Sequence, residues 1–186
     1  MQRVFLDTCV LYPSHLRDTM LRLAEADLFQ PLWSAEILTE LRRNLCNRPA
    51  EDELASAKVD RLISTLTGFF SDSIVDGYEP LVDRMENHPK DRHVLAAALQ
   101  GNADVLLTFN LKDFEVRPVG EGFPELLHPD AFLLDVLDLA PGCVLRLLDR
   151  QVAEHKRPPK HLLGLLDVLD RSGVPGFAAE VRRHLD

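Results

Sequence analysis

The sequence is poor in cysteine and contains no long apolar run. Its three cysteines, Cys9, Cys46 and Cys143, are widely separated and form no C-x-x-C pair. An odd and scattered set of this kind argues against a disulfide framework and against a structural zinc site. No apolar stretch approaches the length of a membrane span, and no basic start leads into an apolar core. We therefore expect a cytoplasmic protein that has no membrane partner.

Basic residues are also fewer than acidic residues. The chain has 21 Lys and Arg against 30 Asp and Glu, which gives a formal net charge of −9. A nucleic-acid partner would therefore need a local basic patch, because the protein as a whole repels phosphate. The 186 residues are enough for one full domain and a small appendage.

One α/β unit, residues 89–114, organises the chain. Asp91 lies where a helix begins, apolar side chains follow at helical spacing, and Gly101 is a suitable helix stop. The apolar run Val105–Leu107 is typical of a parallel strand that is buried on both faces. Ligands of open α/β sheets bind at the carboxyl ends of strands. Three polar residues follow this strand end: Thr108, Asn110 and Asp113.

The rest of the first two thirds repeats the alternation of strand and helix. Residues 3–6 form an apolar strand that ends at Asp7, and Ser34 is a good cap for a helix that carries Glu40 on the flank of its apolar stripe. We also predict strands at 28–33 and 74–75 and helices at 14–26, 51–70 and 80–86. This pattern predicts an α/β fold with a parallel sheet flanked by helices.

The last third of the sequence is helical in character. We predict helices at 129–137, 141–155, 160–171 and 175–185. We place a sheet domain at residues 1–138 and a small all-helical C-terminal extension at 139–186. An apolar stripe on the third of these helices comprises Leu162, Leu163, Leu166 and Leu169. An extension of this size is not stable alone, so it should pack on the sheet domain or on a second copy.

Four acidic residues are expected to converge at the carboxyl edge of the sheet: Asp7, Glu40, Asp91 and Asp113, with Asn110 beside the last. Taken singly, Asp91 could be a helix cap, Glu40 a solvated helix residue and Asp113 a turn residue. Asp7 is the strongest single case, because an acid that ends an apolar strand has little structural use. Together, these oxygen ligands predict a site for Mg²⁺ or Mn²⁺, which could activate water at a phosphodiester.

These residues also carry a resemblance to a known family. The stretches are V-F-L-D-T at Asp7, S-A-E-I-L-T-E-L at Glu40, P-K-D-R-H-V-L-A-A-A at Asp91, and T-F-N-L-K-D-F at Asn110. In order and spacing they resemble a PIN-domain ribonuclease, and within that superfamily the VapC toxins of bacterial toxin–antitoxin pairs. The likeness covers roughly residues 3–135. The segments H-P-D-A-F-L and Q-V-A-E-H-K-R-P-P are similar to the helical extension of one PIN subgroup.

The resemblance implies a Mg²⁺- or Mn²⁺-dependent endoribonuclease that cleaves single-stranded RNA. It also implies a homodimeric toxin and an inhibitory antitoxin whose C-terminal segment wraps the site. The implied catalytic residues are Asp7, Glu40, Asp91 and Asp113, with Asn110 as a further metal ligand and with Thr8 and Thr108 orienting the carboxylates. From their place near the expected rim, four basic residues are candidates for contact with the RNA backbone: Arg43, Lys90, Arg92 and Lys112.

One departure from the family pattern keeps a second hypothesis open. Asn110 stands where many relatives carry a fourth Asp, so one or two metals could bind, and an inactive PIN fold could instead serve as a protein-binding module. A dehalogenase-type phosphatase needs a second Asp where this chain has Cys9, and the paired acids of a receiver domain are missing. We interpret Cys9 as a small buried apolar residue, and His88 and His93 as surface residues.

Overall fold

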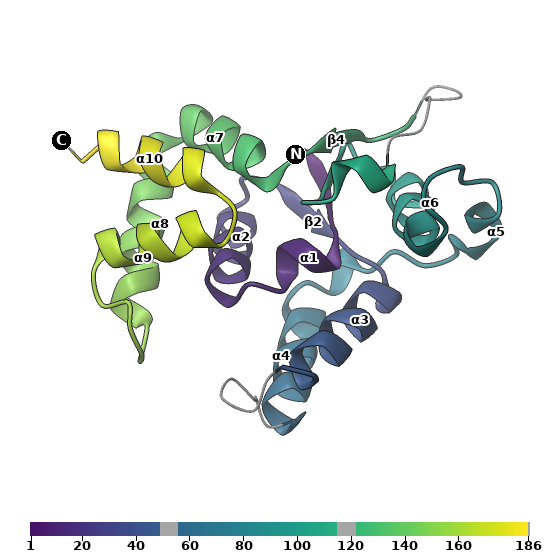
Figure 1. The fold of residues 1–186 in the computed structure, drawn as a ribbon, viewed down its shortest axis with the longest axis horizontal. Helices are drawn as coiled ribbons and strands as arrows, with labels where there is room; N and C mark the ends of the chain where they lie inside the picture. The colour runs from purple at the N-terminus through teal and green to yellow at the C-terminus, as the bar shows by residue number, and fades with distance from the viewer. Residues whose placement is uncertain (49–55, 115–121, 186) are drawn as a thin grey trace.

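The computed structural model describes residues 1–48, 56–114 and 122–185, and its centre is a sheet of four parallel strands. The strands are β1 (Arg3–Leu6), β2 (Gln30–Leu32), β3 (Val105–Leu107) and β4 (Glu125–Leu127), in the order β2-β1-β3-β4. Phe5 pairs with Leu32 on one side and with Leu106 on the other. The predicted α/β fold with a parallel sheet flanked by helices is confirmed (Figure 1).

Helices surround this sheet in groups. The first two thirds of the chain contain α1 (Thr8–Leu11), α2 (Ser14–Glu25), α3 (Ala35–Cys46), α4 (Ser56–Phe69), α5 (Glu79–Val82) and α6 (Arg92–Gln100), with short 3-10 turns at Ser71–Ser73, Pro89–Asp91 and Leu111–Phe114. Figure 1 shows α3 beside α4 below the sheet, and α5 beside α6 on the side opposite the C-terminal helices. None of the helices in the described ranges is long and apolar enough to cross a membrane.

The burial of β1 and β3 explains why the sequence predicted these two strands. Every residue of β3 is buried, as are Val4, Phe5 and Leu6 of β1, so neither strand has a polar face. Ser34 caps α3, since its Oγ accepts a hydrogen bond from the Ile37 backbone N at 3.3 Å. The apolar stripe of α3 is buried, the helix contacts α1 and α4, and Glu40 lies on the flank of the stripe.

Two features of the sheet differ from the sequence prediction. The predicted strand at 74–75 is wrong, because Ile74 forms only an isolated parallel bridge with Trp33. That segment follows a 3-10 turn directly and reaches Gly77, at φ 74°, two residues later, so it is too short to extend the pairing. The edge strand β4 was not predicted, because its first residue, Glu125, is exposed and the run has no clear apolar pattern. Of the predicted helix at 51–70, residues 51–55 lie outside the described ranges.

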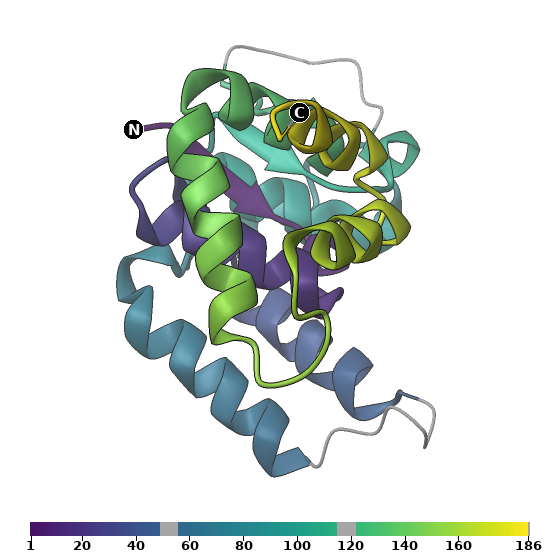
Figure 2. The same ribbon diagram turned by 90° about the vertical axis from the view of Figure 1, so that its left-hand side faces the viewer.

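Four helices follow the sheet: α7 (Pro129–Leu139), α8 (Pro141–Glu154), α9 (Leu162–Arg171) and α10 (Pro175–Arg183). Figure 2 looks onto this side of the molecule, with α8 running in front and α9 and α10 next to one another. Both α8 and α9 contact α2 of the sheet domain. Because α7 crosses position 138, the boundary between residues 1–138 and 139–186 stays a prediction.

A buried polar contact joins the helical extension to the sheet domain. Gln151 of α8 is 0% exposed, and its Oε1 accepts a hydrogen bond from Thr19 Oγ1 at 2.9 Å. Its Nε2 donates to the His15 backbone O at 3.1 Å, and Glu154 forms an ion pair with Arg22 at 2.9 Å. Buried polar groups need such partners, so these contacts specify where α8 lies on α2.

The apolar face of α9 is rotated from the predicted stripe. Leu165, Leu166 and Leu169 are 0% exposed, whereas Leu163 is 55% exposed. The buried face packs on α10, α8 and α2, so partners on three sides select it rather than the helical spacing alone. The prediction was therefore right for Leu166 and Leu169 and wrong for Leu163.

Candidate active site

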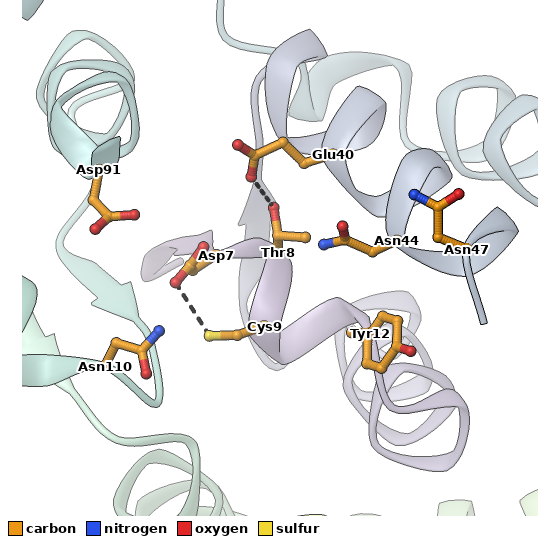
Figure 3. Close-up of a pocket in the computed structure, with 9 residues that line it drawn as sticks. All are labelled: Asp7, Thr8, Cys9, Tyr12, Glu40, Asn44, Asn47, Asp91 and Asn110. Carbon is orange, nitrogen blue, oxygen red and sulfur yellow. Dashed lines mark hydrogen bonds between the residues drawn. The ribbon is translucent and has the colours of Figure 1, made fainter. Parts of the chain in front are cut away.

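A cavity of about 520 Å³ opens at the carboxyl ends of β1 and β3. It is lined by Asp7, Thr8, Cys9, Tyr12, Glu40, Asn44, Asn47, Asp91 and Asn110. Figure 3 shows the carboxylates of Asp7, Glu40 and Asp91 turned toward a common space. Three of the four acids that we expected to converge therefore line one cavity.

Asp7 lies directly after β1, and only 7% of its surface is exposed. Its Oδ2 accepts hydrogen bonds from Thr108 Oγ1 at 2.7 Å and from Cys9 Sγ at 3.1 Å. Thr108 is fully buried at the end of β3, and its Oγ1 in turn accepts a hydrogen bond from the Asn110 backbone N at 3.1 Å. The ends of two neighbouring strands thus hold one carboxylate in a fixed orientation.

The interpretation of Cys9 as a small buried apolar residue is right in part, since its side chain packs against the core, but its sulfur also forms hydrogen bonds. Burial and the negative charge of Asp7 raise the pKa of the Cys9 thiol to about 12, so the sulfur keeps its proton and donates to Asp7. The same sulfur accepts a hydrogen bond from the Phe109 backbone N at 3.3 Å. Its spacing of two residues from Asp7 in the sequence was the one signal for this contact.

Glu40 reaches the cavity from α3 and has two polar partners. Thr8 Oγ1 donates a hydrogen bond to Glu40 Oε2 at 2.9 Å, and His93 Nε2 lies 3.5 Å from Glu40 Oε1. The hydrogen bond with His93 lowers the pKa of Glu40 below its usual value, against the opposing effect of burial. Glu40 is therefore ionised in the neutral pH range.

His93 is not the surface residue that the sequence suggested, since it is only 8% exposed. Its Nδ1 lies 3.4 Å from Glu36 Oε2, within ion-pair distance but without hydrogen-bond geometry, so the ring lies between two acids one turn apart on α3. Burial alone would lower the pKa of His93, but the hydrogen bond with Glu40 and the charges of Glu36, Glu40 and Asp91 raise it. His93 thereby connects α6, which carries Asp91, to the helix that carries Glu40.

Asp91 occupies the N-cap position of α6, as expected, but among the described residues its side chain makes no capping hydrogen bond. The carboxylate instead lines the cavity, with Oδ2 3.6 Å from His88 Nδ1. Burial raises the pKa of Asp91, and the negative charges of Asp7 and Asp113 raise it further. This repulsion is the cost of placing several carboxylates together, and a bound cation would relieve it.

Asn110 and Asp113 follow β3, but they take different places. Asn110 lines the cavity, whereas Asp113 lies outside the set of described residues that line it. The Asp113 backbone O accepts a hydrogen bond from the His88 backbone N at 3.0 Å, which puts this residue beside the turn that precedes Asp91. The role of Asp113 as a direct metal ligand therefore stays a prediction.

The donor set of the cavity has the chemistry of a site for a hard cation. Its carboxylate and amide oxygens suit Mg²⁺ or Mn²⁺. Within residues 1–48, 56–114 and 122–185, no three His, Cys, Asp or Glu side chains are close enough to share an ion directly. Mg²⁺ usually keeps several waters and binds through one or two carboxylates plus substrate phosphate, so wide spacing of the acids is compatible with it.

The four basic candidates for RNA contact lie outside the described cavity lining. Arg43 on α3, Lys90 and Lys112 are exposed, and Arg92 is half-buried with its Nε 3.4 Å from the Asn87 backbone O. The charge of Arg43 helps to lower the pKa of Glu40, after the larger effect of the hydrogen bond with His93. Contact of these four basic residues with RNA stays a prediction.

Three lining residues were missed by sequence reasoning: Tyr12, Asn44 and Asn47. None belongs to a recognisable motif. The two asparagines follow Glu40 at i+4 and i+7, a spacing that places all three on one helical face. That spacing was the available signal for them.

Comparison with known proteins agrees with the order of these motifs. The family model described as PIN domain matches residues 3–112, which include β1, α3, α6 and β3 with Asp7, Glu40 and Asp91. The chain belongs to the PIN domain family. A second model, described as VapC50 C-terminal domain, matches residues 129–183, which comprise the four C-terminal helices of this PIN-domain protein.

One curated relative is similar to a little over half of the chain. It is named "Putative ribonuclease VapC50", from Mycobacterium tuberculosis, and it is 44% identical over 107 residues. The alignment spans 58% of this chain and 63% of the relative, less than two thirds of that protein's length. No solved structure matches the chain.

Proposed function

We propose that this PIN-domain protein is a divalent-metal-dependent endoribonuclease that cleaves single-stranded RNA. The observation that carries the proposal is the convergence of Asp7, Glu40 and Asp91 on one cavity at the carboxyl edge of the sheet. Support also comes from the pKa of Asp91, which is raised by burial and further by the charges of Asp7 and Asp113, because carboxylates are brought together at a cost. The name of the curated relative, a ribonuclease, agrees with this function.

The side chains of the cavity would have different roles in this reaction. One or two of the carboxylates of Asp7, Glu40 and Asp91 would contact Mg²⁺ or Mn²⁺ directly, and the remaining acid would bind the ion through its waters. The amide oxygen of Asn110 would be a neutral ligand. The ion would lower the pKa of a bound water and stabilise charge on the phosphodiester. Thr108 and Cys9 fix the orientation of Asp7, and Thr8 fixes Glu40, through hydrogen bonds of 2.7, 3.1 and 2.9 Å. Asp113 would add negative charge from just beyond Asp91.

Cleavage of a mixed single-stranded RNA pool tests this proposal. The purified protein should cleave the pool with Mg²⁺ or Mn²⁺ and leave it intact with EDTA, because without the ion nothing in the cavity lowers the pKa of the attacking water or stabilises charge on the phosphodiester. Fragments would be resolved by denaturing electrophoresis and their ends sequenced. If cleavage persists in EDTA, or no RNA is cleaved with either metal, the proposed function is wrong.

We further propose that the protein is the toxin of a toxin–antitoxin pair and works as a homodimer. The proposal rests on the VapC50 match of the C-terminal helices and on the VapC name of the relative. A partner whose segment covers the cavity would meet its three carboxylates, so basic side chains are expected in that segment. Co-expression with the product of a neighbouring reading frame should give a complex that no longer cleaves RNA.

Asn110→Asp is expected to tighten metal binding. Asn110 lines the cavity and supplies an oxygen without charge, so the substitution adds a fourth carboxylate to the lining at nearly constant volume. Isothermal titration calorimetry with Mn²⁺ should give a Kd for the variant that is lower than that of the wild type by about tenfold or more. This is the scale of one well-placed charge. An unchanged or weaker affinity would mean that Asp113 already provides this charge.

A further inference from the structure

The cavity extends well beyond the carboxylates. Tyr12, Asn44 and Asn47 line the same space, and none of the three carries a charge at neutral pH. An ion with six waters fills roughly 180 Å³, at about 30 Å³ for each water. Since the cavity measures about 520 Å³, most of it remains for part of a substrate.

One face of α3 runs along the cavity from the carboxylates to the uncharged side chains. Glu40, Asn44 and Asn47 follow one another at i, i+4 and i+7, so they share one face of the helix and its C-cap. The rise of an α-helix puts Asn47 about 10 Å beyond Glu40 along the axis. Figure 3 shows Asn44 between Thr8 and Asn47, with its carboxamide pointing toward Thr8. One helix thus offers a carboxylate and then two carboxamides along the same opening.

Tyr12 is held in place by Arg48. The Arg48 Nε donates a hydrogen bond to Tyr12 Oη at 3.2 Å, and its NH2 group donates to the Tyr12 backbone O at 3.1 Å. The guanidinium carbon lies 4.5 Å from the centroid of the Tyr12 ring, which covers one side of the ring with a cation. Because the ring still lines the cavity, it presents a fixed aromatic surface there.

A second guanidinium lies behind Tyr12. Arg17 is 8% exposed, and its NH1 donates to the backbone O atoms of Leu11 at 2.6 Å and Tyr12 at 3.3 Å. Burial and the neighbouring positive charge of Arg48 lower the pKa of Arg17 to about 10, which leaves it charged at neutral pH. The uncharged end of the cavity is thus backed by two cations, while the opposite end carries the carboxylates.

We propose that Tyr12, Asn44 and Asn47 form a subsite for one nucleobase of single-stranded RNA, next to the phosphodiester that the carboxylates address. This inference rests on the proposed function. Carboxamides both donate and accept hydrogen bonds, so they can read the edge of an unpaired base, and aromatic rings are common stacking surfaces for such bases. The two guanidinium groups favour the phosphate that accompanies the base. The subsite confers base preference at one position beside the cleaved bond.

Binding of RNA without metal tests the subsite. Full-length protein in EDTA and about 0.15 M salt, which screens its net charge of −9, is titrated into 5′-labelled hexanucleotides of A, C, G or U, and fluorescence anisotropy gives the Kd of each. The wild type should bind one of the four about tenfold more tightly than the least favoured, the scale of one good base contact. Asn44→Ala combined with Asn47→Ala should make the four Kd values equal within about twofold.

Gln100→Ala is the matched control, because it removes an exposed carboxamide on α6 outside the described cavity lining. It should keep the wild-type preference, and circular dichroism should show that all variants are folded. Equal binding of the four RNAs by the wild type, no binding at all, or a preference that survives the double substitution would overturn the subsite. Failure of the proposed function gives a different result: base-selective binding persists, but the wild type does not cleave RNA with Mg²⁺ or Mn²⁺.

Discussion

Asp7→Asn is expected to reduce metal-dependent RNA cleavage by at least about 100-fold while the protein stays folded. Residues that only orient metal ligands already contribute about 10–100-fold when they are replaced, so loss of a ligand charge should cost no less. The amide keeps an oxygen that can accept the hydrogen bonds from Thr108 and Cys9. Burial, which is the largest cause of the raised pKa of Asp91, stays in the variant, and only the contribution from the charge of Asp7 is removed. The measurement is the initial rate of RNA-pool cleavage in Mn²⁺, together with thermal unfolding of both proteins.

Asp83→Asn provides the control for this substitution. Asp83 is an exposed acid that follows α5 and lies outside the described cavity lining, so the same chemical change there should leave the cleavage rate unaltered. A purified Asp7→Asn protein that retains more than about a tenth of the wild-type rate would contradict the role of Asp7. A variant that loses both activity and its unfolding transition would show a structural role instead, and Asp91→Asn would then test the carboxylates.

The carboxylate end of the cavity could be predicted from the sequence because its residues follow buried strands. β1 and β3 are apolar on both faces, so their ends are easy to locate, and ligands bind at such ends in parallel sheets. Asp91 was found in the same way, from the start of the helix that precedes β3. The sequence predicted that both Asn110 and Asp113 face the cavity, but only Asn110 is among its described lining residues, and Asp113 lies in the 3-10 turn after β3.

The neutral end of the cavity could not be predicted because it depends on contacts between distant residues. The position of the Tyr12 ring depends on Arg48, which lies 36 residues further along the chain. His93 is buried because two acids of α3 approach it from the side, which the pattern of α6 does not reveal. Residue type alone suggested a surface histidine, which was wrong, and an apolar cysteine, which missed the hydrogen bond between Cys9 and the distant Phe109 backbone N.

In the helical extension, too, the sequence predicted the helices but not which face of α9 is buried. Helical periodicity located α7 to α10 closely, since prolines mark three of their starts. The periodicity of α9 did not identify its buried face, because Leu163 and Leu165 both belong to plausible apolar stripes. Packing against α2, α8 and α10 determines which face of α9 is buried, and this face contains Leu165 and Leu166.

Leu166→Asp is expected to destabilise the protein by at least about 4 kcal/mol and to cause aggregation or loss of the native oligomer. Leu166 is 0% exposed at the centre of α9. Truncation of a buried leucine already costs about 2–5 kcal/mol, and an unpaired carboxylate in the same position adds the cost of burying a charge. For a chain of this size the midpoint of thermal unfolding should fall by about 10 °C or more. Differential scanning calorimetry and size-exclusion chromatography would measure both effects.

Leu163→Asp on the same helix is the matched control for this prediction. Leu163 is 55% exposed in the first turn of α9, where a negative charge is favourable next to the helix N-terminus. We expect its free energy of unfolding to stay within about 0.5 kcal/mol of the wild type. If the two variants behave alike, the assignment of the buried face is wrong. If a chain without residues 139–186 stays soluble, active and in the same oligomeric state, α9 is not needed to complete the core, and its docking through α2 has no role in stability.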